Sequence, residues 1–349
     1  MGEKEKPKGV NDMDKSNIKD IKISVLIIAY ERKEFIKEAL LSVLDQTISR
    51  NQYEIICIVG FEDEDISTFF KENNITEIYC HCRIGKNLSI GLNSCNGDYV
   101  VFLEDDDKFT RDKLELVLKA FENNNIIYYH NNHKIIDKYS QIVNPKQIKF
   151  KEFFKQFTYP ILWEPPHNYH RILLNRGDYN LSCMAVSRTH ITKYNSVLDK
   201  IESAADILVF FLLMQDNLPF FFDINRTTLY RVHENSESHS LQRNHEKLVD
   251  QSKREYHSSL IVYESLKSKS VKKIFIEYYV LPCKFYAYVG GIKDLKPSFI
   301  DKLKLLYYGL TVPNTSYLIL IIVAILYSIF PKYIDKIAEK RATKKYKIS

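Results

Sequence analysis

The chain has 349 residues, a formal net charge of +6, and a hydrophobic fraction of 45%. These values allow one large or two modest folded domains and exclude an intrinsically disordered protein. The charge is mild and much of it lies in residues 331–349, so we expect no nucleic-acid partner. The six cysteines show no second pair with zinc-site spacing, and we expect Cys80 and Cys82 to be buried or reduced thiols.

The first part of the chain alternates between two apolar patterns. Continuous β-branched runs, typical of buried parallel strands, alternate with stretches in which apolar residues recur at helical spacing. Such alternation predicts a parallel sheet with right-handed crossovers. The expected strands are residues 21–30, 53–59, 77–82 and 98–103, and the expected helices are residues 34–46, 66–71 and 87–95.

The next segment continues with strands and helices but carries more polar residues. Residues 126–136 form an expected strand in which strict alternation would place His130 and His133 on opposite faces, so we expect no joint histidine site. Further expected elements are helices at residues 111–123 and 203–215 and strands at residues 181–187 and 219–230.

Four consecutive carboxylates, Glu104 to Asp107, directly follow the apolar run from Val100 to Leu103. Like charges at the end of a buried strand repel one another unless a counter-ion is present. Open α/β sheets bind ligands at the carboxyl ends of their strands. Divalent cations use one or two carboxylates together with substrate phosphates. From the residues alone, a metal site and a solvated acidic turn are about equally favoured.

The two ends of the chain differ from its middle. Residues 1–20 are polar and lack the apolar core of a secretory signal, so we expect a disordered leader and a cytoplasmic catalytic domain. Residues 242–297 predict a helical extension. Phe299, Leu303, Leu306 and Leu310 then recur at the spacing of a helix that lies on a membrane surface.

Residues 305–330 carry no charge, but the almost purely apolar part, 317–330, is shorter than the ~20 residues of a spanning helix. We expect amphipathic and membrane-embedded helices over 298–330 and a basic cytoplasmic tail over 331–349. Basic residues flank both sides of the run, which favours both ends on the cytoplasmic face. One span and a re-entrant or tilted segment remain alternatives. The expected location is the cell membrane, with the catalytic domain on the cytoplasmic face.

With these elements in order, residues 23–238 resemble a family 2 glycosyltransferase of the GT-A fold. Ser24 to Arg32 (SVLIIAYER) is similar to the opening strand and nucleotide loop of that family, and Ala39 to Thr47 to the helix that follows. Gly91 to Tyr99 resembles the run into the metal strand, and Glu104-Asp105-Asp106 stands in place of the Asp-x-Asp motif. The resemblance implies a GT-A (Rossmann-like) α/β domain over residues 21–241, with a mostly parallel sheet flanked by helices and a C-terminal helical membrane-associated region.

The resemblance also implies a reaction and its residues. A sugar would pass with inversion from a nucleotide-diphosphate sugar, UDP- or GDP-linked, to an acceptor hydroxyl, with Mn²⁺ or Mg²⁺ as cofactor. Asp106 would ligate the metal, and Glu104 would reach the ribose or the metal's water shell. Asp206 matches the general base, with Glu202 as the competing residue. Donor contacts would come from Ala29, Tyr30, Glu31, Arg32, Asp63, Asp105, Arg231 and His233.

The apolar C-terminal run favours a lipid-linked glycan or glycolipid as acceptor.

Two other functions remain open beside sugar transfer. A nucleotidyltransferase has a similar sheet and acidic pair, but it needs a glycine-rich loop near the first strand, and residues 21–53 contain no glycine. A membrane-anchored binding module without catalysis could also keep the fold, although the intact acidic cluster and Asp206 argue against it.

Overall fold

The computed structural model describes residues 21–30, 32–143, 156–233, 245–289, 292–311, 322 and 326. The chain divides into two compact units. The first comprises residues 1–200 and 205–231, and the second comprises residues 201–204 and 232–349.

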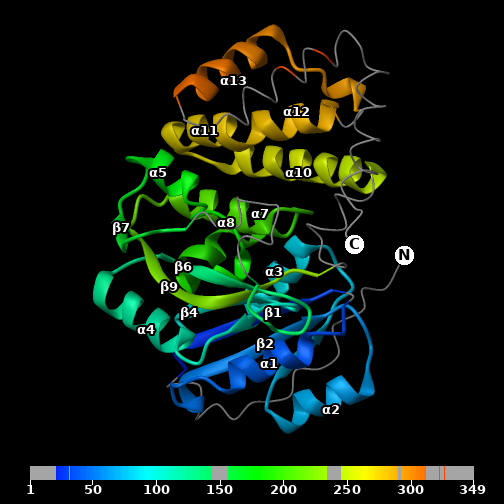
Figure 1. Cartoon of the computed structure of the whole chain (residues 1–349), viewed down its shortest axis with the longest axis vertical. Coiled ribbons are helices and arrows are strands. Elements are labelled where there is room, and N and C mark those ends of the chain that lie inside the picture. The colour runs from blue at the N-terminus through cyan, green and yellow to red at the C-terminus, as the bar shows by residue number, and fades with distance from the viewer. Residues whose placement is uncertain are drawn as a thin grey trace. The chain divides into compact units, whose positions relative to one another are not determined.

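The described part of the first unit is built on a nine-stranded sheet with the order β3-β2-β1-β4-β8-β6-β9-β5, in which β7 also pairs with β9 (Figure 1). The strands are β1 (Ile23–Ala29), β2 (Tyr53–Val59), β3 (Thr76–Tyr79), β4 (Tyr99–Glu104), β5 (Lys108–Phe109), β6 (Tyr128–Ile136), β7 (Ile161–Trp163), β8 (Met184–Ser187) and β9 (Phe220–Arg231). The main helices are α1 (Ile36–Leu44), α2 (Glu64–Glu72), α3 (Ile84–Ser94), α4 (Lys113–Asn124), α5 (Tyr169–Leu174), α6 (Arg188–Ile191), α7 (Asn195–Leu198) and α8 (Ala205–Met214).

The sheet is mixed, which corrects the expectation of a mostly parallel sheet. β1 pairs in parallel with both β2 and β4, and β2 with β3, as the strand–helix alternation predicts. Beyond β4 the direction changes, because β8 is antiparallel to both β4 and β6. β6 and β9 are again parallel to each other, while β5 and β7 are antiparallel to β9. The two halves of the sheet therefore meet at the β4–β8 pair, which involves Tyr99 to Val101 of β4.

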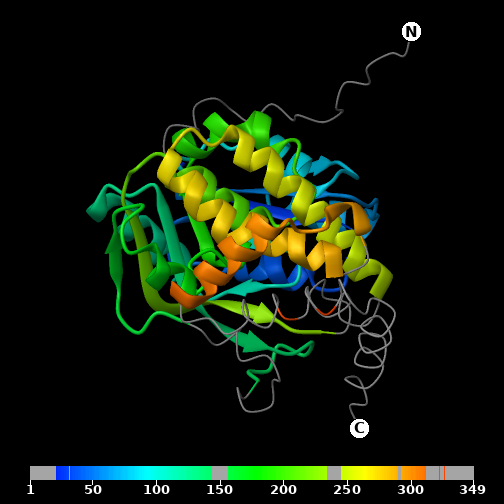
Figure 2. The same ribbon diagram turned by 90° about the horizontal axis from the view of Figure 1, so that it is seen from above.

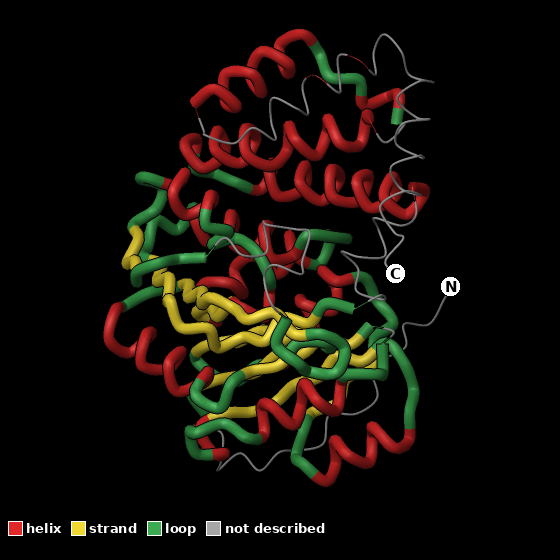
Figure 3. Tube along the Cα trace, viewed as in Figure 1, coloured by secondary structure: helices red, strands yellow, loops and turns green. Residues whose placement is uncertain are grey.

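The main hydrophobic core lies between the sheet and α1, α2 and α4. Alternate residues of β1, such as Val25, point into this core because side chains alternate along a strand. α3 covers the opposite face, where a Cβ on Gly91 would lie 2.3 Å from a methyl carbon of Leu26. Figure 3 shows the strands in yellow with helices on both sides. Helical residues of the core include Leu40, Phe70 and Val117.

The described residues of the second unit are almost entirely helical. α10 (His245–Ser265) is followed by α11 (Lys269–Phe275), a π-helical turn (Ile276–Val280) and α12 (Leu281–Val289). α13 (Phe299–Thr311) contacts α12 and the π-helical turn. Within this unit α13, drawn in orange, lies on the side of α11 and α12 away from α10 (Figures 1 and 2). No helix in the described parts of the chain has the length and apolar character needed to cross a membrane.

Several predictions for the two ends of the chain concern residues that the structure does not describe. The C-terminal ones are the run at 312–330, apart from residues 322 and 326, and the basic tail at 331–349. The N-terminal one is the expected leader at residues 1–20. The amphipathic helix expected from Phe299 onward is present as α13.

Candidate active site

The acidic loop, residues 104–107, begins at the last residue of β4. Asp105, Asp106 and Asp107 are all buried, and Glu104 is half-buried. The Asp107 amide donates to the Glu104 carbonyl at 3.2 Å, which folds the loop into a turn. The loop therefore holds four carboxyl groups together at the carboxyl end of a central strand, as the sequence predicts.

Arg32, in the loop that follows β1, supplies positive charge to this turn. One guanidinium nitrogen pairs with Asp105 and the other with Asp106. Burial alone would lower the pKa of Arg32, but the charges of Asp105 and Asp106 outweigh burial and raise it. Arg32 was expected to contact the donor, and in this structure it binds the acidic loop directly.

The positive charge of Arg32 does not neutralise the whole loop. Burial raises the pKa of Asp105 to about 7, although Arg32 opposes the shift. Burial and the charge of Asp106 raise the pKa of Asp107 to about 8. Burial, followed by the charges of Asp107 and Asp106, holds the pKa of Glu104 well above its usual range. The loop therefore carries more carboxylate than its surroundings balance, which is the electrostatic condition that a bound cation relieves.

Arg231, the last residue of β9, holds the loop from the other side. Its backbone amide donates to Asp107 Oδ1 at 2.8 Å, and its Nε donates to the Asp106 carbonyl at 2.7 Å. Its remaining nitrogens bond to the Asp137 and Lys138 carbonyls and to Glu38 Oε2. The side chain is fully buried. Arg231 was expected to contact the donor diphosphate, and in this structure its Nε binds the acidic loop.

Asp206 lies in the first turn of α8 and is half-buried. Its Oδ2 accepts a hydrogen bond from the Asn180 amide at 3.0 Å. Burial raises the pKa of Asp206, and backbone hydrogen bonds from Ile207 and Asn180 partly offset the shift. The charge of Asp206 in turn contributes to the raised pKa of Glu104, so the two carboxyl groups share one electrostatic environment.

A short turn joins Asp206 to the acidic loop. The Asn180 side chain accepts from the Ser182 amide at 2.8 Å and so begins the 3₁₀ turn Leu181–Cys183. Ser182 Oγ accepts from the Glu104 amide at 3.0 Å, and its side chain opposes the rise in the pKa of Asp107. The Asn180 amide meanwhile binds Asp206. This turn thus contacts both the acidic loop and the candidate base, and the local sequence gave no indication of it.

His130 supports the same turn from β6. Its Nε2 lies 2.8 Å from the Tyr179 carbonyl, and because a carbonyl can only accept, Nε2 is the donor. That carbonyl and the Asn180 amide belong to one peptide group, so His130 and Asp206 bind its two ends. Burial lowers the pKa of His130 to about 3, so the imidazole is neutral. His130 therefore orients the peptide that holds Asp206.

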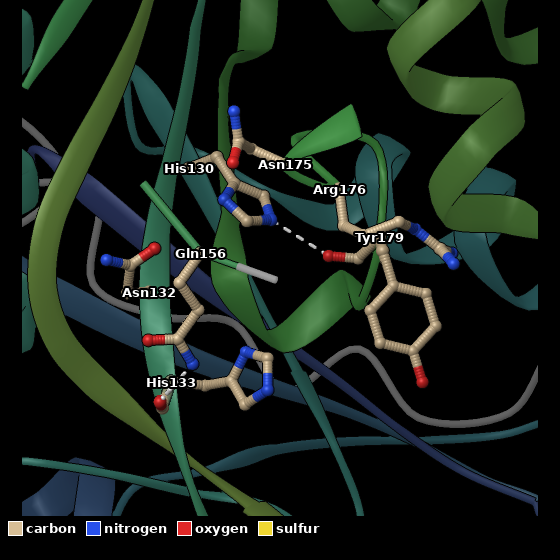
Figure 4. Close-up of a pocket in the computed structure, with 7 residues that line it drawn as sticks. All are labelled: His130, Asn132, His133, Gln156, Asn175, Arg176 and Tyr179. Carbon is tan, nitrogen blue, oxygen red and sulfur yellow. Dashed lines mark hydrogen bonds between the residues drawn. The ribbon is translucent and has the colours of Figure 1, made fainter. Parts of the chain in front are cut away.

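His130 and His133 line one small polar cavity, contrary to the expectation from strict alternation (Figure 4). The β6–β9 ladder shifts register between Asn131 and His133, and this irregularity rotates the side chains out of simple alternation. The dashed lines in Figure 4 mark the hydrogen bonds from His130 to the Tyr179 carbonyl and from Gln156 to the His133 carbonyl. The other lining residues are Asn132, Asn175 and Arg176.

The carboxyl ends of β1 and β2 approach each other beside Arg32. The Gly60 amide donates to the Ala29 carbonyl at 2.9 Å, and a Cβ on Gly60 would lie 2.2 Å from the Tyr30 carbonyl oxygen. Tyr30 is partly exposed and stacks on His81 with a centroid separation of 4.9 Å. Only glycine allows this approach, which brings Ala29 and Tyr30 to the edge of the sheet where the acidic loop lies.

The remaining predicted site residues are placed as follows. Asp63 caps α2 by accepting from the Ile66 amide at 3.1 Å, and it pairs with Lys33. Glu31 lies outside the described residues. His233 and the competing base Glu202 belong to the second unit. Cys80 and Cys82 are half-buried and form a disulfide, so the expectation of buried or reduced thiols is wrong for this structure.

The acidic loop does not form a self-contained metal site. Among the residues that the structure describes, no group of three or more histidine, cysteine, aspartate or glutamate side chains could hold a metal ion. Mg²⁺ and similar hard cations, however, need only one or two carboxylates when substrate phosphates supply further oxygens. The uncompensated carboxylates beside Arg32 fit a cation that binds together with a phosphorylated ligand.

Solved structures with the same fold include two glycosyltransferase-type proteins. The chain aligns with TarS of Staphylococcus aureus in complex with UDP-GlcNAc at a TM-score of 0.53 and 16% identity, covering 88% of this chain and 92% of that one. It aligns with the mannosyltransferase PcManGT of Pyrobaculum calidifontis, in complex with GDP-Man and Mn²⁺, at a TM-score of 0.52 and 12% identity, covering 93% and 92%. At these identities the likeness shows the fold, which is of the GT-A-like α/β class.

The sequence comparisons add the family. Residues 24–186 match the model of Glycosyl transferase family 2. An uncharacterized glycosyltransferase of Rickettsia bellii is 34% identical over 142 residues, which are 38% of this chain and 20% of that protein. The Escherichia coli protein WfgD, named as UDP-Glc:alpha-D-GlcNAc-diphosphoundecaprenol beta-1,3-glucosyltransferase, is 26% identical over 147 residues, 39% of this chain and 56% of that protein. Residues 24–186 therefore match a glycosyltransferase family 2 domain, and the matches cover 20% and 56% of the two relatives.

Proposed function

We propose that this protein transfers a sugar, with inversion, from a nucleotide-diphosphate sugar to an acceptor hydroxyl. The observation that carries the proposal is the turn at residues 180–182. Through it Asp206 and the buried acidic loop are held together by the Asn180 amide and the Ser182 hydroxyl. A base for the acceptor and a charged cradle for the leaving group are the two parts that such a transfer needs.

Each part has a defined chemical task. The oxygen of the acceptor hydroxyl attacks the anomeric carbon, and Asp206 takes the proton of that hydroxyl. The bond from that carbon to the diphosphate oxygen breaks on the opposite face, and the nucleoside diphosphate departs. The Asn180 amide holds Oδ2 of Asp206 in place, which limits rotation of the carboxylate. A positioned base of this kind contributes typically 10²–10⁴-fold to the rate.

Asp106 and Glu104 would hold a Mn²⁺ or Mg²⁺ ion bound with the diphosphate. When bound, such an ion stabilises the charge that develops on the leaving group. Arg32 pairs with Asp106 at 2.5 Å, so its positive charge would also lie near the oxygens of the leaving diphosphate. The exposed ring of Tyr30 and the Ala29 end of β1 would form part of the nucleotide site. UDP- and GDP-sugars are both candidate donors, because the fold neighbours were solved with UDP-GlcNAc and GDP-Man.

The proposed acceptor is lipid-linked, and the proposed place of reaction is the cytoplasmic face of the cell membrane. Support comes from the name of the Escherichia coli relative, whose acceptor is a sugar on diphosphoundecaprenol. The uncharged apolar run at residues 305–330 is consistent with an acceptor of this kind.

This acceptor can be tested with donors labelled in the sugar. Purified protein, Mn²⁺ and labelled UDP- or GDP-sugars would be incubated with bacterial membranes, and the lipids extracted into organic solvent. We expect label in the lipid extract, released by mild acid as expected for a diphosphate-linked glycan. Label found only on soluble protein would contradict the lipid acceptor and leave the transfer itself intact.

A further inference from the structure

α13 is fixed to the second unit by one face only. The helix starts at a capping box, in which Ser298 Oγ accepts from the Asp301 amide at 3.1 Å and Asp301 accepts from the Ser298 amide at 2.9 Å. Asp301 also pairs with Lys284 of α12 at 2.9 Å. Leu305, one turn further along, is fully buried. Asp301 and Leu305 therefore define the side of α13 that faces its own unit.

The opposite side of α13 is an exposed apolar stripe. At about 100° per residue, its five members fall within an arc of about 120°. Phe299 is 74% exposed, Ile300 63% and Tyr307 64%. These are the largest exposures for apolar residues on any described helix of this unit. The complete stripe is Phe299, Ile300, Leu303, Leu306 and Tyr307.

A lysine lies at each border of this stripe. Lys302 follows Leu306 around the helix on one side, and Lys304 follows Ile300 on the other, at the angles that the helical repeat dictates. Lys304 is exposed and Lys302 half-buried. Lys296, just before the helix, is exposed as well. The single acid of the helix, Asp301, faces inward to Lys284. The outward side thus combines an apolar centre with basic edges.

We propose that the α13 stripe is a docking surface for an anionic lipid bilayer. The apolar side chains would enter the headgroup–acyl boundary, and the bordering lysines would extend their ammonium groups to lipid phosphates. Tyr307 belongs to the aromatic types enriched at membrane interfaces, and Phe299 to those found on the apolar face of interfacial helices. Helices of this kind lie in the plane of the interface, so the absence of a spanning helix among the described residues does not oppose the proposal.

The chain beyond the helix favours lipid over a protein partner. The sequence continues from α13 with an uncharged run to Phe330 and then with seven lysines or arginines against two acids. An apolar segment followed by a basic one suits the apolar interior and the negatively charged headgroups of an anionic bilayer. Ile322 and Leu326, the two described residues of that run, are helical and exposed. A protein groove would not require this repeated pairing of apolar and basic segments.

The test is flotation of the full-length protein with vesicles of phosphatidylcholine, with and without phosphatidylglycerol. We expect binding to the anionic vesicles, which weakens with added salt because the lysine contribution is screened. The double variant Phe299→Ser/Leu303→Ser should bind at least about tenfold more weakly, since two apolar side chains no longer enter the interface. Leu41→Ser, on the exposed side of α1, is the matched control and should bind as the wild type does.

All three substituted positions are exposed, so urea unfolding curves should coincide and exclude misfolding as the cause. Unchanged flotation of the stripe variant would overturn the proposal. So would wild-type self-association in solution that the stripe variant abolishes, without any difference in lipid binding. The assay contains no sugar donor, so its failure would leave the proposed transfer untouched.

Discussion

Replacing Asp206 by asparagine is expected to lower the transfer rate by about 10²- to 10⁴-fold. Asparagine keeps the shape of the side chain and can still accept from the Asn180 amide, but it cannot take the acceptor proton. The KM for the donor should stay within a few fold, since no donor contact is removed. Initial rates of nucleoside diphosphate release would measure both quantities. Asp199→Asn, at a half-buried carboxylate that pairs with Lys86 away from the acidic loop, is the control. A fully active Asp206→Asn enzyme would exclude Asp206 as the base.

Substitutions of His130 should also lower the transfer rate, by an amount that depends on the new side chain. His130→Leu removes the donor to the Tyr179 carbonyl, so the peptide that holds Asp206 loses one of its two restraints. We expect kcat to fall with little change in the KM of the donor. His130→Gln offers an amide donor to the same carbonyl and should recover part of the rate. An equal loss in both variants would indicate a packing effect in place of the positioning role.

Replacing Asp106 by asparagine is expected to weaken metal-dependent binding of the nucleotide by at least about a hundredfold, because one metal ligand and its charge are removed. Calorimetric titration with UDP or GDP, with and without Mn²⁺, would measure the effect. Without the metal, wild type and variant should differ little. Asp65→Asn, in the first turn of α2, is the control. Equal Mn²⁺ dependence in the variant and the wild type would show that Asp106 is not a ligand.

The first half of the sheet could be predicted from the sequence, because each strand of β1, β2 and β4 is a nearly unbroken apolar run buried on both faces. The acidic loop follows from the same pattern, since its position depends only on where β4 ends. The reversal at β8 could not be predicted. Strand direction there depends on the path of the chain from β6 to β8, and residues 184–187 are apolar in either direction.

The contacts within the site were harder to foresee. The family resemblance assigns Arg231 to the donor phosphates. In the structure its guanidinium binds backbone carbonyls and Glu38, because the end of β9 lies against the acidic loop. The roles of Ser182 and Asn180 arise from contacts across more than twenty residues of chain. His130 and His133 share a cavity only because the ladder shifts register between them. The spacing of residues within one segment does not predict contacts between residues that are far apart in the chain.

The most direct test of the proposed transfer is the identity of the nucleotide product. Purified protein would be incubated with Mn²⁺, membranes and a panel of UDP- and GDP-sugars, and the released nucleotide separated by ion-exchange chromatography. The proposed mechanism predicts free nucleoside diphosphate, formed by the wild type and lost in Asp206→Asn. Release of pyrophosphate would instead identify a nucleotidyltransferase, and no release across the whole panel would contradict sugar transfer by this protein.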